Sequence, residues 1–319
     1  MIPAVGQRIG WADLPAHLRD AVEAILRSGV VTAASQPGGF SPGTADRVVT
    51  ADGRRAFVKA VGAGLNTRSV EMARAELRIT AAMPAAAPVP RLLGSFDDGQ
   101  WVALVLEDIA GVHPRTPWVE DELAATASAL AELAETLTPS PVPDAPRVAD
   151  LLAADLAGWA RIAAEPPADL DPWAAAHLDL LIAAAERGLA AIATGDTLTH
   201  GDVRSDNLLI RPDGSVVVVD WPWGSVGPRW LDTVLLGINV IVHGGDPEPL
   251  LAGVDPGAAT DLIAGLAGYF LDACRLPPPP GIPRVRAFQR AQGVAVLPWV
   301  RDRLMGAAAH RRDPGNPPH

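Results

Sequence analysis

Cysteine and lysine are almost absent from this 319-residue chain. Cys274 is the only cysteine, so neither an intramolecular disulfide nor a cysteine-based zinc site can form, and we expect no redox function. Of the 26 basic residues, 25 are arginine and one, Lys59, is lysine. Lys59 is therefore the only side chain that can supply an ammonium group.

Long hydrophobic runs are also lacking. No segment approaches the roughly 18 apolar residues of a membrane-spanning helix, and the N-terminus lacks the basic and apolar regions of a signal peptide. The net charge of −11 disfavours binding to nucleic-acid phosphates. We expect a cytoplasmic protein that binds neither membranes nor nucleic acid, and the sequence leaves its oligomeric state unknown.

The chain is about twice a typical domain length, which favours two lobes. Its charge is divided unevenly: residues 1–111 carry 11 basic and 11 acidic side chains, and residues 112–319 carry 15 and 26. The acidic second part favours a cationic ligand, although solvated helix faces explain much of such charge in most proteins.

Hydrophobic periodicity predicts an α+β fold with two different lobes. In the first, we expect a five-stranded antiparallel sheet with one helix, after an opening helix near residues 14–26. The strands are predicted near residues 30–34, 47–50, 56–61, 91–96 and 101–106, and the helix at 67–83. The second lobe reads as mainly helical, with helices at 119–137, 148–163, 172–193, 257–274 and 283–309 and a hairpin within 198–220. The predicted domains are a nucleotide-binding lobe at 1–110, a catalytic and substrate lobe at 111–309, and a flexible tail at 310–319.

The segment HGDVRSDNLLI, residues 200–210, carries the sharpest chemical signal. It places Asp202 and Asn207 five residues apart in an irregular loop before an apolar strand, and Asp220 ends the next strand. Two oxygen ligands that converge from adjacent strand ends suit a hard cation such as Mg²⁺, and another carboxylate can accept a proton from a hydroxyl. Loop capping by Asp and Asn is the structural alternative.

This loop resembles that of the aminoglycoside phosphotransferase family, within the protein-kinase-like fold. The family pattern of His-Gly-Asp, four residues, and Asn is matched by His200, Gly201, Asp202 and Asn207, and its downstream metal-binding Asp by Asp220. The resemblance also extends upstream in the right order, over about residues 30–245. It implies a small-molecule kinase that uses ATP, with GTP as an alternative donor, and Mg²⁺.

The resemblance also implies a nucleotide site in the first lobe. Lys59 would contact the phosphates, and a glutamate of the 67–83 helix would hold its ammonium. Glu71 and Glu76 lie about 140° apart around a helix, so only one can face Lys59, and the family spacing favours Glu76. The implied nucleotide-binding residues are Gly38, Gly39, Phe40, Ser41 and Gly43 of a Gly-rich loop, Lys59, Glu76, and the hinge residues Glu107 and Ile109.

In the catalytic loop, the resemblance assigns catalysis to Asp202. Arg204 departs from the aminoglycoside phosphotransferases, which often have histidine there, and occupies the position of a lysine that faces the γ-phosphate in serine/threonine protein kinases, so we also predict it as catalytic. Asp202 would accept or orient the acceptor hydroxyl, Arg204 would neutralise the transferred charge, and Asn207 and Asp220 would bind magnesium. We interpret His200 as a hydrogen-bonding support of the loop. Asp232 either supports the same loop or is a solvated helix carboxylate.

Three tryptophans near the predicted metal site, Trp221, Trp223 and Trp230, fill core space or stack on a ring substrate.

The leading prediction is an enzyme, a kinase that transfers the γ-phosphate of ATP to a hydroxyl of an unidentified small molecule. An amine-bearing acceptor such as an aminoglycoside-like compound or an amino alcohol is preferred, and a sugar is an alternative. A catalytically weak, nucleotide-binding pseudokinase that acts through partner contacts is the competing hypothesis. A metal-dependent hydrolase would need further His/Asp ligands at helical spacing, and we find none.

Overall fold

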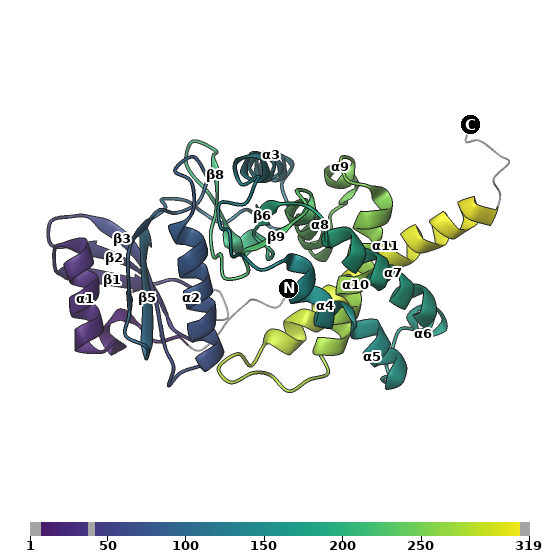
Figure 1. Cartoon of the computed structure of the whole chain (residues 1–319), viewed down its shortest axis with the longest axis horizontal. Helices are drawn as coiled ribbons and strands as arrows, with labels where there is room; N and C mark the ends of the chain where they lie inside the picture. The colour runs from purple at the N-terminus through teal and green to yellow at the C-terminus, as the bar shows by residue number, and fades with distance from the viewer. Residues whose placement is uncertain (1–7, 38–41, 313–319) are drawn as a thin grey trace.

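The computed structural model describes residues 8–37 and 42–312, which form two lobes side by side (Figure 1). The first lobe contains an antiparallel sheet in the order β1-β2-β3-β5-β4. Its strands are β1 (Val30–Ser35), β2 (Thr44–Thr50), β3 (Arg55–Gly62), β4 (Leu92–Asp97) and β5 (Trp101–Glu107). The predicted five-stranded sheet and α+β class are confirmed.

One helix covers each face of this sheet, as Figure 1 shows. Side chains alternate along each strand, so β3 can contribute apolar groups to both faces. Val58 packs with Leu18 of α1 (Ala16–Leu26), and Val61 packs with apolar residues of α2 (Thr67–Ala81). A short 3-10 helix, η1 (Trp11–Asp13), precedes α1.

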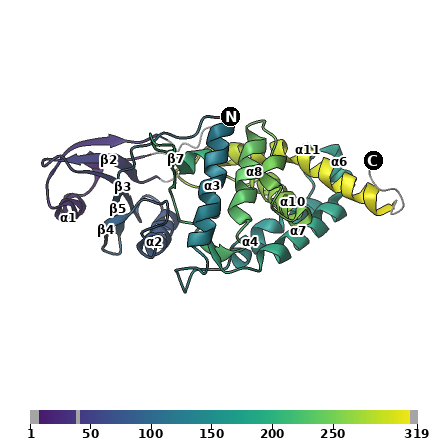
Figure 2. The ribbon, with the colours of Figure 1, turned by 90° about the horizontal axis from the view of Figure 1, so that it is seen from above.

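The second lobe is mainly helical (Figure 2). Its helices are α3 (Glu120–Thr136), α4 (Val148–Leu156), α5 (Gly158–Ala164), α6 (Pro172–Ala176), α7 (Leu178–Ile192), α8 (Leu231–Val242), α9 (Glu248–Leu251), α10 (Pro256–Ala273) and α11 (Val285–Arg312). Helix α10 is buried along most of its length against α7, α11 and α5. A Cβ atom on Gly158 would lie 2.5 Å from the backbone of Gly268, so glycine allows α5 to approach α10 closely.

Several predicted boundaries in this lobe were wrong. The helix expected at 148–163 is interrupted at Ala157, between α4 and α5, and the one at 172–193 is interrupted at His177, whose Nδ1 bonds to the carbonyl of Trp173. Helix α11 contains Pro298 and continues to Arg312, past the expected start of the tail at residue 310. Residues 313–319 lie outside the described part of the chain.

Two short sheets lie between the helices and carry the catalytic loop. β6 (Thr197–Thr199) pairs with β9 (Ser225–Gly227), and β7 (Leu208–Ile210) pairs with β8 (Val216–Val218). The β7–β8 hairpin was expected, and β9 was not. Residues 200–207 connect β6 to β7 and end in a 3-10 turn, η2 (Ser205–Asn207). Asp220 follows β8, so the two predicted metal ligands lie near the ends of paired strands.

Within residues 8–37 and 42–312, no helix combines the length and apolar character needed to cross a membrane.

Candidate active site

His200 and Asp232 hold the catalytic loop in place through hydrogen bonds to its backbone. Asp232, near the start of α8, is buried and accepts hydrogen bonds from the backbone N–H groups of His200 (2.8 Å) and Gly201 (3.0 Å). The His200 Nε2 lies 2.9 Å from the carbonyl of Val219, and its Nδ1 accepts from the N–H of Asp202 (3.2 Å). His200 thus supports the loop through hydrogen bonds at both ring nitrogens, and Asp232 is not a solvated carboxylate.

Asp202 lies at the centre of a dense set of hydrogen bonds. The Arg204 Nη1 donates to both of its carboxylate oxygens, each at 2.7 Å. The Nε and Nη2 of Arg204 donate to the two oxygens of Asp206, at 2.9 and 3.0 Å. The Nδ2 of Asn207 donates to the Asp202 carbonyl oxygen (2.8 Å). The loop therefore places the predicted Asp202, Arg204 and Asn207 together, with Asp206 as an addition.

Burial raises the pKa of the Asp202 carboxyl, and the nearby Arg204 guanidinium opposes part of that rise. Burial alone would lower the pKa of Arg204, but Asp202 and Asp206 raise it above its usual value. Arg204 is therefore a permanent cation in this site.

Lys59 joins the first lobe to Asp220, which follows β8 in the second lobe. Its Nζ lies 2.7 and 2.6 Å from the two carboxylate oxygens of Glu76 on α2, and it also donates to the Oδ1 of Asp220. Glu76 is buried, whereas Glu71 is exposed to solvent. Of the two glutamates considered, the structure brings Glu76 to Lys59.

Charge pairing favours the ionised forms of Lys59 and Asp220, whereas burial raises the pKa of the Glu76 carboxyl. Burial opposes ionisation of Asp220, but the Lys59 ammonium lowers the pKa of its carboxyl overall. Burial likewise opposes the charge of Lys59, and Asp220 and Glu76 raise its pKa above the usual value. Asp220 has a φ of 70°, a left-handed conformation that is uncommon for residues other than glycine. Such strain is often found at functional sites.

The predicted hinge lies beside a cavity of about 360 Å³. Glu107 and Ile109 line it, but the Glu107 carboxylate faces Arg91 (3.1 Å) and Arg211 (3.8 Å). The Glu107 carboxylate is thus paired with arginines, and its backbone N–H donates to the carbonyl of Arg91 (2.9 Å).

Two arginines from the sheet anchor the hinge through Asp108, which is almost fully buried. The Nε of Arg47 lies 2.6 Å from one of its oxygens and the Nε of Arg55 lies 2.7 Å from the other. Arg47 also donates to the Ile109 carbonyl oxygen (3.3 Å).

Of the predicted Gly-rich loop, Gly38, Gly39, Phe40 and Ser41 lie outside the described residues. Gly43 is described, and it has a packing reason to be glycine. A Cβ atom there would lie 2.1 Å from the carbonyl oxygen of Ala60, so any side chain would push β2 away from β3.

Asn207 and Asp220 fit the chemistry of a magnesium site. The N–H of Val219 donates to the Asn207 carbonyl (2.9 Å), which ties the turn at Asn207 to the residue before Asp220. An amide oxygen and a carboxylate are hard ligands, and Mg²⁺ is usually bound by one or two such side chains together with substrate phosphates. In the described part of the chain, no group of three or more His, Cys, Asp and Glu side chains is arranged to hold a metal ion.

Asp155 of α4 is a half-buried carboxylate on the helical side of the site. Burial raises the pKa of its carboxyl, and Arg161 and Arg68 oppose that rise. Asp155 and Asp202 both act electrostatically on the phenol of Tyr269, whose hydroxyl accepts a hydrogen bond from Gln289 (3.1 Å). This carboxylate belongs to the acidic excess of the second part of the chain, and Tyr269 lies within electrostatic range of both it and Asp202.

The tryptophans near the site have different environments. Trp221 is almost fully buried and packs edge-on against His200, so it is a core residue. Trp223 lies under Arg68 of α2, whose Cζ is 5.9 Å from the ring centre. Trp230 is partly buried beside the helical core. Trp223 thus contacts Arg68 of the first lobe, and the backbone N–H of Trp221 bonds to the carboxylate of Glu76 on α2.

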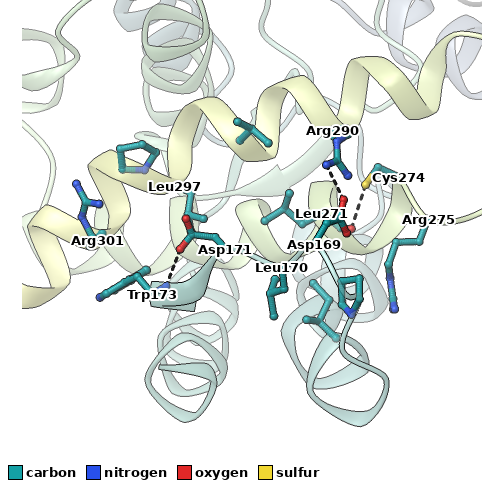
Figure 3. A pocket seen from close by; sticks show the side chains of 14 residues that line it. Asp169, Leu170, Asp171, Trp173, Leu271, Cys274, Arg275, Arg290, Leu297 and Arg301 are labelled. Atoms are coloured by element: carbon teal, nitrogen blue, oxygen red, sulfur yellow. Dashed lines mark hydrogen bonds and ion pairs between the residues drawn. The ribbon is translucent and has the colours of Figure 1, made fainter. Parts of the chain in front are cut away.

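A separate cavity of about 330 Å³ lies among α5, α6, α10 and α11, and it contains none of the predicted catalytic residues (Figure 3). Arg290 and Asp169 form an ion pair on its wall at 2.7 Å, and Cys274 lies beside them. The Cys274 Sγ is bonded to the carbonyl of Leu271.

Three residues of the site were missed by sequence reasoning. Asp206 lies two residues after Arg204, and its position within the catalytic loop is the sequence feature that could have identified it. Asp155 comes from α4, and Phe288 of α11 places its ring centre 5.5 Å from the Arg204 Cζ. No local pattern distinguishes these two from neighbouring core and surface residues.

A match to the phosphotransferase enzyme family extends over residues 37–268. The chain belongs to this family. The predicted class of enzyme, a phosphotransferase with a hydroxyl group as acceptor, is confirmed, and the pseudokinase alternative is not supported. No curated protein matches the chain significantly in sequence.

Solved structures share the fold of this phosphotransferase at low sequence identity. Choline kinase LicA from Streptococcus pneumoniae is 15% identical over 88% of this chain and 98% of its own, with a TM-score of 0.58. A thermostable mutant of aminoglycoside phosphotransferase APH(4)-Ia, in a ternary complex with ADP and hygromycin B, is 14% identical over 94% and 100%, with a TM-score of 0.55. An aminoglycoside phosphotransferase from Alicyclobacillus acidocaldarius is 16% identical over 87% and 93%, with a TM-score of 0.50. These likenesses confirm the protein-kinase-like fold.

Proposed function

We propose that this phosphotransferase transfers the γ-phosphate of ATP to a hydroxyl of a small molecule. The observation that carries the proposal is the position of Lys59, which is bonded to both Glu76 and Asp220 beside the Asp202 loop. A lysine held between two carboxylates is preorganised to contact phosphates. The complexes of similar structures with AMP and ADP support nucleotide use, and GTP is the alternative donor.

In this proposal Asn207 and Asp220 hold Mg²⁺, which would neutralise charge on the phosphates. Asp202 orients the acceptor hydroxyl and accepts its proton, because, of Asp202 and Asp220, it is the one that is not bonded to Lys59. The Arg204 guanidinium stabilises the negative charge of the transferred phosphoryl group. The hinge at Glu107 and Ile109 and the Gly-rich loop hold the nucleotide between lobes 1–110 and 111–309.

The acceptor we propose carries an amine. Asp155, Asp202 and Asp206 supply three carboxylates on the helical side of the site, where one arginine, Arg204, is bonded to two of them. Asp155 forms no ion pair among the described residues, although Arg161 and Arg68 act on it electrostatically, and it is the carboxylate that we assign to a cation of the ligand. Similar structures include a choline kinase and aminoglycoside phosphotransferases, whose substrates carry cationic nitrogen. An ATP-dependent enzyme of this kind would act in the cytoplasm.

The test is turnover of Mg·ATP with a panel of alcohols that differ in charge. We expect phosphorylation of amino alcohols or aminoglycoside-like compounds above the rate with water, and loss of that activity in Asp202→Asn. Turnover of anionic or uncharged alcohols alone would reject the amine preference. Absence of ATP turnover and of any thermal shift with Mg·ATP would reject the kinase itself.

A further inference from the structure

Among the described residues, Arg204 is the only cation bonded to Asp202. Its nitrogen donors are divided between two carboxylates, those of Asp202 and Asp206. Two of its nitrogens, Nε and Nη2, form a fork on Asp206, and only Nη1 is directed at Asp202. A two-point contact with one carboxylate fixes the plane of a guanidinium, which a single-point contact does not. The orientation of Arg204 is therefore set by Asp206.

An aromatic ring covers the same guanidinium. Phe288, on the first turns of α11, places its ring centre 5.5 Å from the Arg204 Cζ. The Arg204 side chain is only 14% exposed, so the ring meets a largely desolvated cation. The attraction between a cation and a ring face is stronger when water is excluded.

The position of Phe288 is itself fixed by neighbouring contacts. The next residue, Gln289, donates to the hydroxyl of Tyr269 on α10 (3.1 Å) and accepts from the Nη1 of Arg286 (2.9 Å). The N–H of Phe288 bonds to the carbonyl of Arg284 (3.0 Å). These contacts fix the backbone of α11 on both sides of Phe288, whose ring lies beside Arg204.

We propose that Asp206 and Phe288 are positioning residues that hold the Arg204 guanidinium across Asp202. The proposal rests on the kinase function proposed above, and adds how one helix of the acceptor lobe controls the catalytic loop. Phosphoryl transfer depends on groups placed in line before the reaction, so a cation that is already oriented needs no rearrangement in the transition state. A rotated Arg204 would leave Asp202 uncovered and the transferred charge unneutralised.

The proposal is tested with two variants and two matched controls. Asp206→Asn removes the fork, and Asp97→Asn removes the same type of fork from Arg74 on the surface of the first lobe; the two aspartates are 34% and 35% exposed. Phe288→Leu removes the ring, and Trp299→Leu removes the ring that faces Arg303 at 5.3 Å on the same helix. The controls report general effects on stability.

We expect kcat to fall about ten- to hundredfold in Asp206→Asn and about three- to thirtyfold in Phe288→Leu, with KM for ATP nearly unchanged. Phe288→Tyr keeps the ring and should restore most of the activity. Both controls should keep the kcat of the wild type. An unchanged kcat in Phe288→Leu, a loss no greater than in Trp299→Leu, or a rise in KM alone would overturn the positioning role.

A second measurement separates this proposal from the proposed function. The Nε–H resonance of Arg204, assigned by its absence in Arg204→Lys, should carry a ring-current shift that disappears in Phe288→Leu and persists in Phe288→Tyr and Trp299→Leu. In Asp206→Asn the same N–H should exchange faster with water. A resonance that is unchanged in Phe288→Leu rejects the positioning role even if the wild type phosphorylates no acceptor, whereas absent turnover with the expected shifts rejects only the kinase function.

Discussion

The Nζ of Lys59 lies 2.7 and 2.6 Å from the carboxylate oxygens of Glu76, and the same nitrogen donates to Asp220. The only lysine of the chain is thus bonded to both lobes, since Glu76 lies on α2 and Asp220 follows β8. Removing one partner of a buried ion pair lowers the stability of the fold, because the other charge stays buried without a counter-charge.

Replacing Glu76 should therefore lower both activity and stability. We expect Glu76→Gln to reduce kcat/KM by about a hundredfold or more, since Lys59 would lose its anchor and shift towards Asp220. Glu71→Gln is the matched control on the same helix, and it should behave as the wild type because Glu71 is exposed. Steady-state kinetics with varied Mg·ATP measures kcat/KM of the two variants. Equal losses of kcat/KM in both would contradict the assignment of Glu76 as the partner of Lys59.

Because Lys59 is the only lysine, chemical labelling can test its place without an acceptor. A lysine-directed acyl phosphate of ATP should modify the wild type at Lys59, and excess Mg·ATP should protect that residue. Lys59→Arg should not be labelled. It should also lack the activity of the wild type, because a guanidinium differs in shape from an ammonium. Mass spectrometry of the tryptic peptides reads the result. Labelling that Mg·ATP does not reduce would place the nucleotide elsewhere.

The pH dependence of acceptor binding should report on Asp155. Burial raises the pKa of this carboxyl above the usual value near 3.9, and it binds an ammonium only when ionised. The KM of an amine acceptor should thus fall as the pH rises through that raised pKa. In Asp155→Asn the pH step should disappear and KM at neutral pH should rise about tenfold. An uncharged alcohol is the control. The same pH step with that alcohol would show that Asp155 does not bind the amine of the acceptor.

Asn66 should contribute both to α2 and to the contact between lobes. Its Oδ1 accepts from the Ser69 N–H (2.9 Å) at the start of α2, and its Nδ2 donates to the Pro280 carbonyl (3.3 Å) in the loop before α11. Asn66→Ala should lower the free energy of unfolding by about 1 kcal/mol, whereas Asn66→Asp keeps the cap and should lose less. Urea unfolding measures the difference.

Both Asn66 variants lose the amide donor to Pro280, so residues 276–284 should be cleaved faster by proteases in both than in the wild type. Unchanged cleavage would show that this bond does not hold the loop.

Local patterns were sufficient for most of the elements that carry the site. Residues 47–50 and 56–61 alternate or contain β-branched side chains, which favour strands, and the 67–83 segment has helical spacing. The spacing of Asp202, Asn207 and Asp220 around short apolar strands predicted a shared site, because strand ends in a hairpin lie together. The solitary Lys59 could be chosen from composition alone.

The contacts that complete the site depended on tertiary structure. Phe288 is 84 residues beyond Arg204, and Asp155 comes from a helix that the periodicity extended through Ala157. Nothing in a local window shows which face of a helix will meet a distant loop, because that depends on how α10 and α11 pack. The sequence by itself determined which chemical groups were available and the short spacings between them, and the packing of the helices decided which of those groups meet at Arg204.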